Sequence, residues 1–101
     1  MTIITLLTDF GLSDSYVAAM KGVIAGIAQQ ATVIDITHQI APHNVREAAY
    51  VLATALPYFP PGTIHMAIAD PGVGSARRPM AAQAGDYTLV GPDNGVFTYA
   101  L

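Results

Sequence analysis

Short apolar segments typical of β-strands alternate with segments typical of amphipathic helices along most of this chain. Strands are predicted at residues 2–8 (TIITLLT), 32–37 (TVIDIT) and 63–69 (TIHMAIA), because each is short, apolar and rich in β-branched side chains. Helices are predicted between them, and two further strands at residues 80–83 and 87–91. Strand, helix, strand, helix, strand at this spacing is typical of a parallel sheet with right-handed crossovers. We therefore expect an α/β fold, a three-layer sandwich around a mostly parallel sheet.

Both predicted helices have an apolar stripe and recognisable ends. The first runs from about Asp14 to Ala28, and Ser13 or Asp14 can cap its start. The second begins at Asn44, which can act as the cap while Glu47 reaches back, and Pro57 stops it. The stripe expected to be buried in the first helix consists of Val17, Met20, Val23, Ile24 and Ile27.

The charge content excludes several classes of protein. The chain is 52% hydrophobic and only 11% charged, which argues against disorder and suggests that more chain or another subunit covers part of the surface. A net charge of −3 argues against a nucleic-acid partner. Asp9 interrupts the first apolar run, so neither a signal peptide nor a membrane span is expected there. The lack of cysteine fits a protein of the reducing cytoplasm.

Polar residues follow the predicted strands at their carboxyl ends. Asp9, the pair Thr37-His38, Asp70 and Asp93 each come just after a predicted strand. In open α/β sheets ligands bind beyond this edge, so the architecture would gather these side chains along one rim. The alternative for each residue is that it merely caps a turn.

The segment IADPGVGSARRP, residues 68–79, places two adjacent arginines behind a glycine-rich turn. It lacks the third glycine of the dinucleotide fingerprint, the Gly-Lys-Ser/Thr of a P-loop and the Gly-x-Ser-x-Gly of a nucleophile elbow. The turn can instead bring Asp70 and Arg77 together, so that the carboxylate fixes the guanidinium as a rigid fork of donors for a water or an anion. The spacing equally allows a loop salt bridge with no further role.

Four blocks of the sequence, in order and in register, closely resemble the S-adenosylmethionine hydroxide adenosyltransferase family, relatives of fluorinase and chlorinase. They are TLLTDFGLSDSYVAAMKGVI, DITHQIAPHNVREAAYVL, FPPGTIHMAIADPGVGSARR and GPDNG, and together they cover essentially the whole chain. The resemblance implies a Rossmann-like N-terminal α/β domain, of which residues 1–101 would be a truncated part, followed by a β-barrel domain that is absent here. It also implies a homotrimer with substrate held between subunits, and no cofactor, because S-adenosylmethionine is the substrate.

The family reaction is attack of water or hydroxide on the ribose C5′ of S-adenosylmethionine, which gives adenosine and methionine. Carried over residue by residue, Asp9 would accept hydrogen bonds from the two ribose hydroxyls. Asp70 and Arg77, with a histidine expected beyond Leu101, are implicated in activating water. The halogenase relatives tend to have an aromatic residue at the position of Asp70, so Asp70 followed by Arg77 points to hydrolysis.

For the other candidate site residues the sequence allows two roles each. The family commonly has an aromatic residue and then Asp where this chain has His43-Asn44, so His43 either stacks on the substrate or lies at the surface beside the helix cap. Asn94, with Asp93, either contacts the ligand or holds a turn through side-chain-to-backbone hydrogen bonds.

Three further residues are given structural roles. We expect His38 to satisfy a backbone group near the rim, Lys21 to snorkel at the edge of its helix, and Tyr16 to pack. His38, His43 and His65 lack metal-site spacing, so no metal is expected.

Three functions remain in competition at this point. The first is an S-adenosylmethionine hydrolase, in which residues 1–101 alone would be inactive and prone to associate. The second is a non-catalytic module that binds adenosine or S-adenosylmethionine. The third is a fragment without independent function. A downstream histidine and β-barrel domain would decide for the enzyme.

Overall fold

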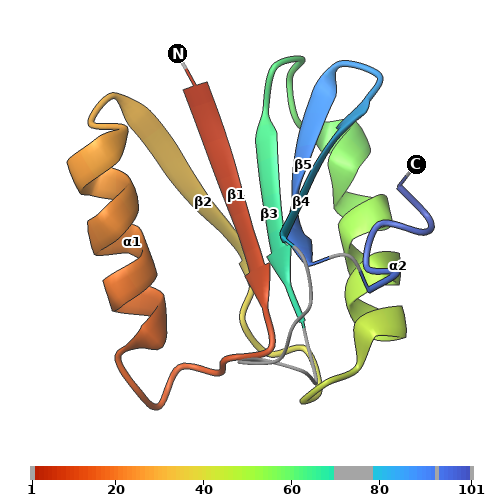
Figure 1. Cartoon of the computed structure of the whole chain (residues 1–101), viewed down its shortest axis with the longest axis horizontal. Coiled ribbons are helices and arrows are strands. Elements are labelled where there is room, and N and C mark those ends of the chain that lie inside the picture. Colours follow the sequence, from red (N-terminus) through yellow and green to blue (C-terminus); the bar gives the residue numbers. More distant parts are fainter. Residues whose placement is uncertain (1, 70–78, 93, 101) are drawn as a thin grey trace.

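The computed structural model describes residues 2–69, 79–92 and 94–100, and within them it forms one five-stranded sheet with helices (Figure 1). In chain order the elements are β1 (Thr2–Thr8), α1 (Tyr16–Ile27), β2 (Ala31–Thr37), α2 (Val45–Ala55), the 3₁₀ turn η1 (Leu56–Tyr58), β3 (Ile64–Ile68), β4 (Pro79–Ala84) and β5 (Tyr87–Pro92). The strand order is β2-β1-β3-β5-β4, and only the β4–β5 pair is antiparallel. The expected α/β fold with a mostly parallel sheet is confirmed.

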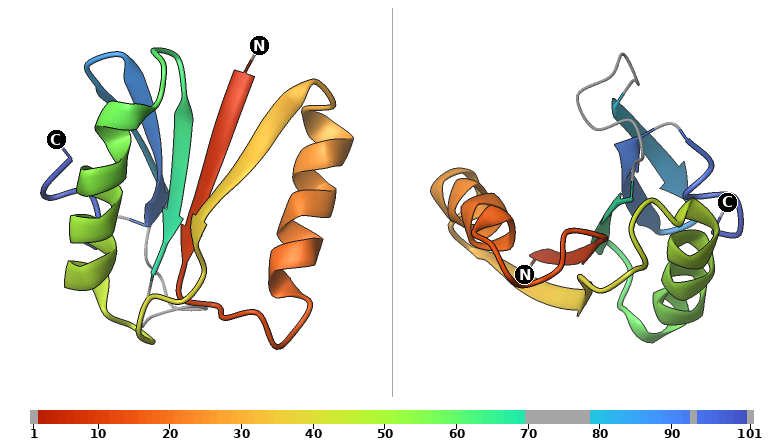
Figure 2. Two further views of the ribbon diagram at one scale, coloured as in Figure 1. Left: turned by 180° about the vertical axis from the view of Figure 1, so that it is seen from behind. Right: turned by 90° about the horizontal axis from the view of Figure 1, so that it is seen from below.

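The path of the chain places α1 and α2 on opposite faces of this sheet (Figure 2). From β1 the chain crosses through α1 to β2 on one side, and from β2 it crosses through α2 to β3 on the other side of β1. Right-handed crossovers that run in opposite directions put their helices on opposite faces. The sheet is therefore the middle layer of three.

The core lies between the sheet and α2. Residues 4–8 of β1 are all buried, as expected for a central strand with both neighbours paired. In β3 burial alternates, because His65 and Ala67 are fully buried while Ile64, Met66 and Ile68 are only partly buried. The core cluster on this side is built from Leu7, Ile40, Ala48, Leu52, Leu56, Ala67, Ala69, Leu89, Val96 and Phe97.

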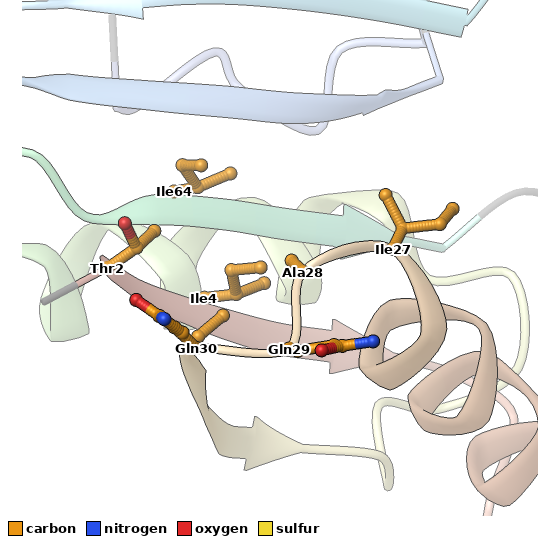
Figure 3. Close-up of a pocket in the computed structure, with 8 residues that line it drawn as sticks. Thr2, Ile4, Ile27, Ala28, Gln29, Gln30 and Ile64 are labelled. Atoms are coloured by element: carbon orange, nitrogen blue, oxygen red, sulfur yellow. The ribbon is translucent and has the colours of Figure 1, made fainter.

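The apolar stripe expected on α1 is buried only in part, since Met20 and Ile24 are half-buried. Only Val17 is buried, whereas Val23 is 63% and Ile27 is 82% exposed. Beside Ile27 lies an open groove of about 750 Å³, which is also lined by Ile4 and Ile64 of the sheet (Figure 3). Within the described residues α1 is the helix on this face of the sheet, and no other helix packs on that face (Figure 2). The helix is amphipathic as expected, but its apolar side is left largely uncovered.

The helix ends follow the sequence signals in part. Asn44 caps α2 as expected, because its Oδ1 accepts from the Glu47 N–H at 2.9 Å, but the Glu47 carboxylate reaches back to the Ala41 N–H rather than to Asn44. In α1 the cap residue is Ser15, with no side-chain bond, while Asp14 accepts from the Tyr16 N–H. Neither helix, among the residues that the structure describes, is long and apolar enough to cross a membrane.

Candidate functional site

Asp9 lies at the reversal point of the sheet, where the strand order changes direction: β2 was added on one side of β1 and β3 on the other. It follows β1, the strand between β2 and β3, and its N–H donates to the Ile68 carbonyl at the end of β3 at 3.3 Å. The two crossovers run in opposite directions from here, so Asp9 stands at the topological switch point, the region where ligands bind in open α/β sheets. The expected place of Asp9 at the carboxyl edge is thus confirmed.

The carboxylate of Asp9 is held from one side. Its Oδ2 accepts from the backbone N–H of His43 at 2.8 Å, while Oδ1 has no hydrogen-bond partner among the described residues. The side chain is only half-buried. An oriented carboxylate with free acceptor capacity can bind two neighbouring hydroxyl groups.

His43 presents a backbone donor to Asp9 and an exposed ring to solvent. Its φ of 64° lies in the left-handed region, which is uncommon for a residue other than glycine and is often found at functional sites. Among the described residues its ring has no hydrogen bond or ring contact, and the residue is exposed. His43 therefore holds Asp9 through its backbone and leaves its ring available at the surface.

Asn94 holds its loop through the backbone. Its Nδ2 donates to the Ala69 carbonyl at 2.7 Å and its Oδ1 accepts from the Val96 N–H at 3.1 Å. These are the side-chain-to-backbone bonds of the second role, and they tie the end of β5 to the end of β3. Asp70, Arg77 and Asp93 lie outside the described residues.

His38 corrects the expectation that its ring satisfies a backbone group. The ring is buried and bonds to two side chains: Nδ1 lies 2.8 Å from Thr8 Oγ1, and Nε2 lies 2.7 Å from Asp35 Oδ1. Asp35 in turn accepts from Lys21 Nζ at 2.6 Å, so Lys21 forms an ion pair rather than snorkelling. Burial acts to raise the pKa of Asp35, but the hydrogen bonds from Lys21 and His38 outweigh it and lower this pKa. The spacing Asp35-x-x-His38 was the sequence signal for these linked hydrogen bonds, and the sequence analysis did not use it.

The other sequence candidates lie away from the Asp9 edge or are exposed. His65 is fully buried in the core, where Nδ1 lies 2.6 Å from Thr5 Oγ1. Burial lowers the pKa of His65 to about 4. The expected packing of Tyr16 is wrong in the main, since it is 64% exposed and, among the described residues, its ring pairs with that of Phe10 alone, with ring centroids 6.0 Å apart. Among the described residues, no three His, Cys, Asp or Glu side chains are grouped as a metal would require.

The chain is similar to proteins named as S-adenosylmethionine hydrolases and, at lower identity, to proteins named as fluorinases. It is 52% identical to the (R)-S-adenosyl-L-methionine hydrolase of Methanocaldococcus jannaschii over 98% of this chain and 39% of that protein, and 53% identical to the one of Thermus thermophilus over 93% and 36%. It is 29% identical to the fluorinase of Actinopolyspora mzabensis over 98% of this chain and 41% of that protein. The chain thus spans about two fifths of the length of these relatives.

A solved structure and a family model agree with these relatives. The crystal structure of a conserved hypothetical protein from Thermus thermophilus matches with a TM-score of 0.91 at 51% identity, over 99% of this chain and 42% of that one. Residues 4–101 match the model of the SAM hydroxide adenosyltransferase N-terminal domain. This match takes in nearly every residue of the sequence, and the chain belongs to that family.

Proposed function

We propose that this chain is the N-terminal part of an S-adenosyl-L-methionine hydrolase, which forms adenosine and methionine. A water oxygen forms a bond to the ribose C5′ as the C5′–S bond breaks. The electron pair of that bond leaves with sulfur as the neutral thioether of methionine, and the water releases a proton. Because a sulfonium leaves as a neutral group, the site needs no general acid and has only to hold water in line behind C5′.

The observation that carries this proposal is the carboxylate of Asp9. It stands at the reversal point of the sheet, oriented by the His43 N–H and with Oδ1 open among the described residues. A ribose presents two neighbouring hydroxyl donors, and one carboxylate can accept from both. Asp9 would therefore bind the ribose, and the exposed ring of His43 would stack on the substrate. Asp93 and Asn94 would line the same edge, since Asn94 bonds to Ala69 just beyond β3.

Asp70 and Arg77 would supply the chemistry. Both lie outside the described residues, and their roles rest on the motif ADPGVGSARR and on the similarity to the named hydrolases. The guanidinium of Arg77, fixed by the carboxylate of Asp70, would replace part of the hydration shell of the attacking water. This favours hydrolysis over the halide transfer that the name fluorinase denotes for the more distant relatives.

The remaining features of the proposal concern assembly and setting. We expect a Rossmann-like domain of a cytoplasmic homotrimer, in which other parts of the protein cover the apolar groove beside Ile27 and complete the substrate site. No cofactor is expected. The net charge of −3 speaks against a nucleic-acid partner.

The experiment that tests the function is incubation of the full-length protein with S-adenosylmethionine in oxygen-18 water. Label in the 5′-hydroxyl of the adenosine product is expected, because the water oxygen attacks C5′. Tight binding of adenosine without turnover would instead favour the non-catalytic binding module. Methionine and adenosine formed without label at the 5′-oxygen would contradict attack at C5′.

A further inference from the structure

A continuous chain of side-chain hydrogen bonds runs from the surface of α1 to the residue before Asp9. It starts at Lys21, passes through Asp35 and the buried ring of His38, and ends at Thr8, with distances of 2.6, 2.7 and 2.8 Å. Thr8 is fully buried, whereas Lys21 and Asp35 are about two fifths exposed. The chain therefore connects an exposed ion pair to a hydroxyl in the interior beside the candidate site.

The local irregularity of β2 explains how Asp35 and His38 come together. Residues three apart in a regular strand point to opposite faces. Here the pairing of β1 with β2 shifts register, from Leu6 opposite Asp35 to Leu7 opposite Thr37, so one extra residue is accommodated on β2. Such a bulge reverses the alternation once and re-aims the side chains that follow it.

The hydrogen bonds can be assigned one direction throughout. Thr8 Oγ1 already accepts from the Phe10 N–H at 3.2 Å, so its own O–H is free to donate to His38 Nδ1. His38 Nε2–H then donates to Asp35, whose other oxygen accepts from the Lys21 ammonium. In this tautomer both ring nitrogens of His38 are used, Nδ1 as an acceptor and Nε2–H as a donor.

His38 also fastens the turn on both sides of Asp9. Its ring holds Thr8, the residue before, and its carbonyl accepts from the N–H of Gly11, two residues after, at 2.7 Å. Gly11 has a φ of 73°, which suits glycine and lets the chain double back here. Asp9 thus lies between two anchors that belong to one buried residue.

We propose that His38 is a positioning residue of the S-adenosylmethionine site, which acts through Thr8 to fix the direction of the Asp9 carboxylate. Lys21 and Asp35 hold the His38 ring in the orientation and tautomer that this needs. The proposal rests on the proposed function, because it assumes that Asp9 binds the ribose. It assigns His38 no contact with substrate, so its effect is on the geometry of Asp9 alone.

Two variants of Thr8 in the full-length protein separate positioning from simple stability, with adenosine binding measured by calorimetry. Thr8→Val keeps the shape but removes the hydroxyl, and we expect adenosine affinity to fall about tenfold. Thr8→Ser keeps the hydroxyl but removes a buried methyl group, so the free energy of unfolding should fall while the affinity stays within about threefold of the wild type. A loss of affinity that followed the loss of stability in both variants would overturn the proposal.

A second pair of variants tests His38 directly and serves if Thr8→Val does not fold. Asn can reproduce the bond of Nδ1 to Thr8, whereas Gln can reproduce only the bond of Nε2 to Asp35. His38→Asn is therefore expected to bind adenosine more tightly than His38→Gln. Equal affinity of both with the wild type would overturn the positioning role and leave the proposed function intact. Failure of the wild type to bind adenosine would overturn both.

Discussion

Asp9 Oδ2 accepts a hydrogen bond from the backbone N–H of His43 at 2.8 Å, across 34 positions of the sequence. The bond ties the end of β1 to the loop that precedes α2. The backbone of His43, which donates it, has a φ of 64°. A left-handed backbone at a residue other than glycine costs roughly 1 kcal/mol or more, which surrounding contacts must offset. One carboxylate oxygen therefore holds the loop, and the other has no hydrogen-bond partner among the described residues.

Variants of Asp9 should separate these two functions in the full-length protein. In Asp9→Ala all acceptors are lost, and adenosine affinity should fall about a hundredfold, because hydrogen bonds to a charged group are the strong ones. In Asp9→Asn one acceptor oxygen remains for the His43 N–H, so the loss should be smaller. Calorimetric titration with adenosine measures both, and an unchanged affinity in Asp9→Ala would remove Asp9 from the site.

His43→Gly isolates the ring of His43 from its backbone. Glycine adopts a φ of 64° without strain and keeps the N–H that Asp9 accepts, so the free energy of unfolding should change little. If the ring stacks on the substrate, adenosine affinity should fall about tenfold, and His43→Phe should retain it. A glycine variant that bound adenosine like the wild type would return His43 to the role of a surface residue beside the helix cap.

Asp70 and Arg77 are expected to act as a unit. If Asp70 only positions Arg77, the double alanine variant should turn over scarcely more slowly than Arg77→Ala alone. Single-turnover rates of the full-length enzyme give the comparison. Strictly additive losses in the logarithm of the rate would refute the pairing. A larger loss in Arg78→Ala than in Arg77→Ala would mean that the register assigned to the glycine turn is wrong.

Features fixed by local chemistry were predictable from the sequence. The apolar run of β1 and the Asn44 cap depend on neighbouring residues only, and both appear where they were expected. The edge position of Asp9 follows from the alternation of strands and helices, because crossover handedness leaves few topologies. The match of the chain to its family agrees with the motifs that suggested it.

Features that depend on partners distant in the sequence were not predictable. The pattern of α1 shows an apolar face but not what covers it, so the exposure of Ile27 could not be foreseen. Likewise Asp35 bonds to His38 across the register shift between β1 and β2, and to Lys21 on a separate helix, and no local pattern encodes either bond. The roles of Asp70 and Arg77 rest on the motif alone, since both lie outside the described residues.

Gly91 in β5 should be the least replaceable glycine in the sheet. A Cβ added there would meet the Ala67 carbonyl of β3 and, at 3.1 Å, the ring of Phe97. Gly91→Ala should therefore lower the free energy of unfolding by about 2 kcal/mol or more, since β3 and β5 must move apart. The matched control is Gly22→Ala on α1, where nothing lies within 4 Å and a gain of about 1 kcal/mol is expected. Equal effects in denaturant titrations would contradict the close approach at Gly91.

His65 should make the stability of the fold depend on pH. The ring is fully buried and makes T-shaped contacts with the Phe59 and Tyr87 rings, and among the described residues its Nε2 has no hydrogen-bond partner. Burial lowers its pKa from an ordinary 6.5 to about 4. Below pH 6.5 the His65 ring is therefore protonated in the unfolded state, whereas in the folded state it binds a proton only near pH 4. Its contribution to the free energy of unfolding is thus complete above pH 6.5 and is lost as the pH falls towards 4.

Between pH 7 and pH 5 this single group should lower the free energy of unfolding by about 2 kcal/mol, as the linkage relation gives for such a shift. Denaturant titrations of the full-length protein at both values measure it. The control is the double variant Thr5→Val/His65→Leu, which replaces both members of the buried 2.6 Å pair by apolar groups of similar volume. Carboxylates and the other histidines titrate alike in both proteins, so the difference between their pH slopes belongs to His65. Parallel slopes would mean that the buried ring accepts its proton at an ordinary pH.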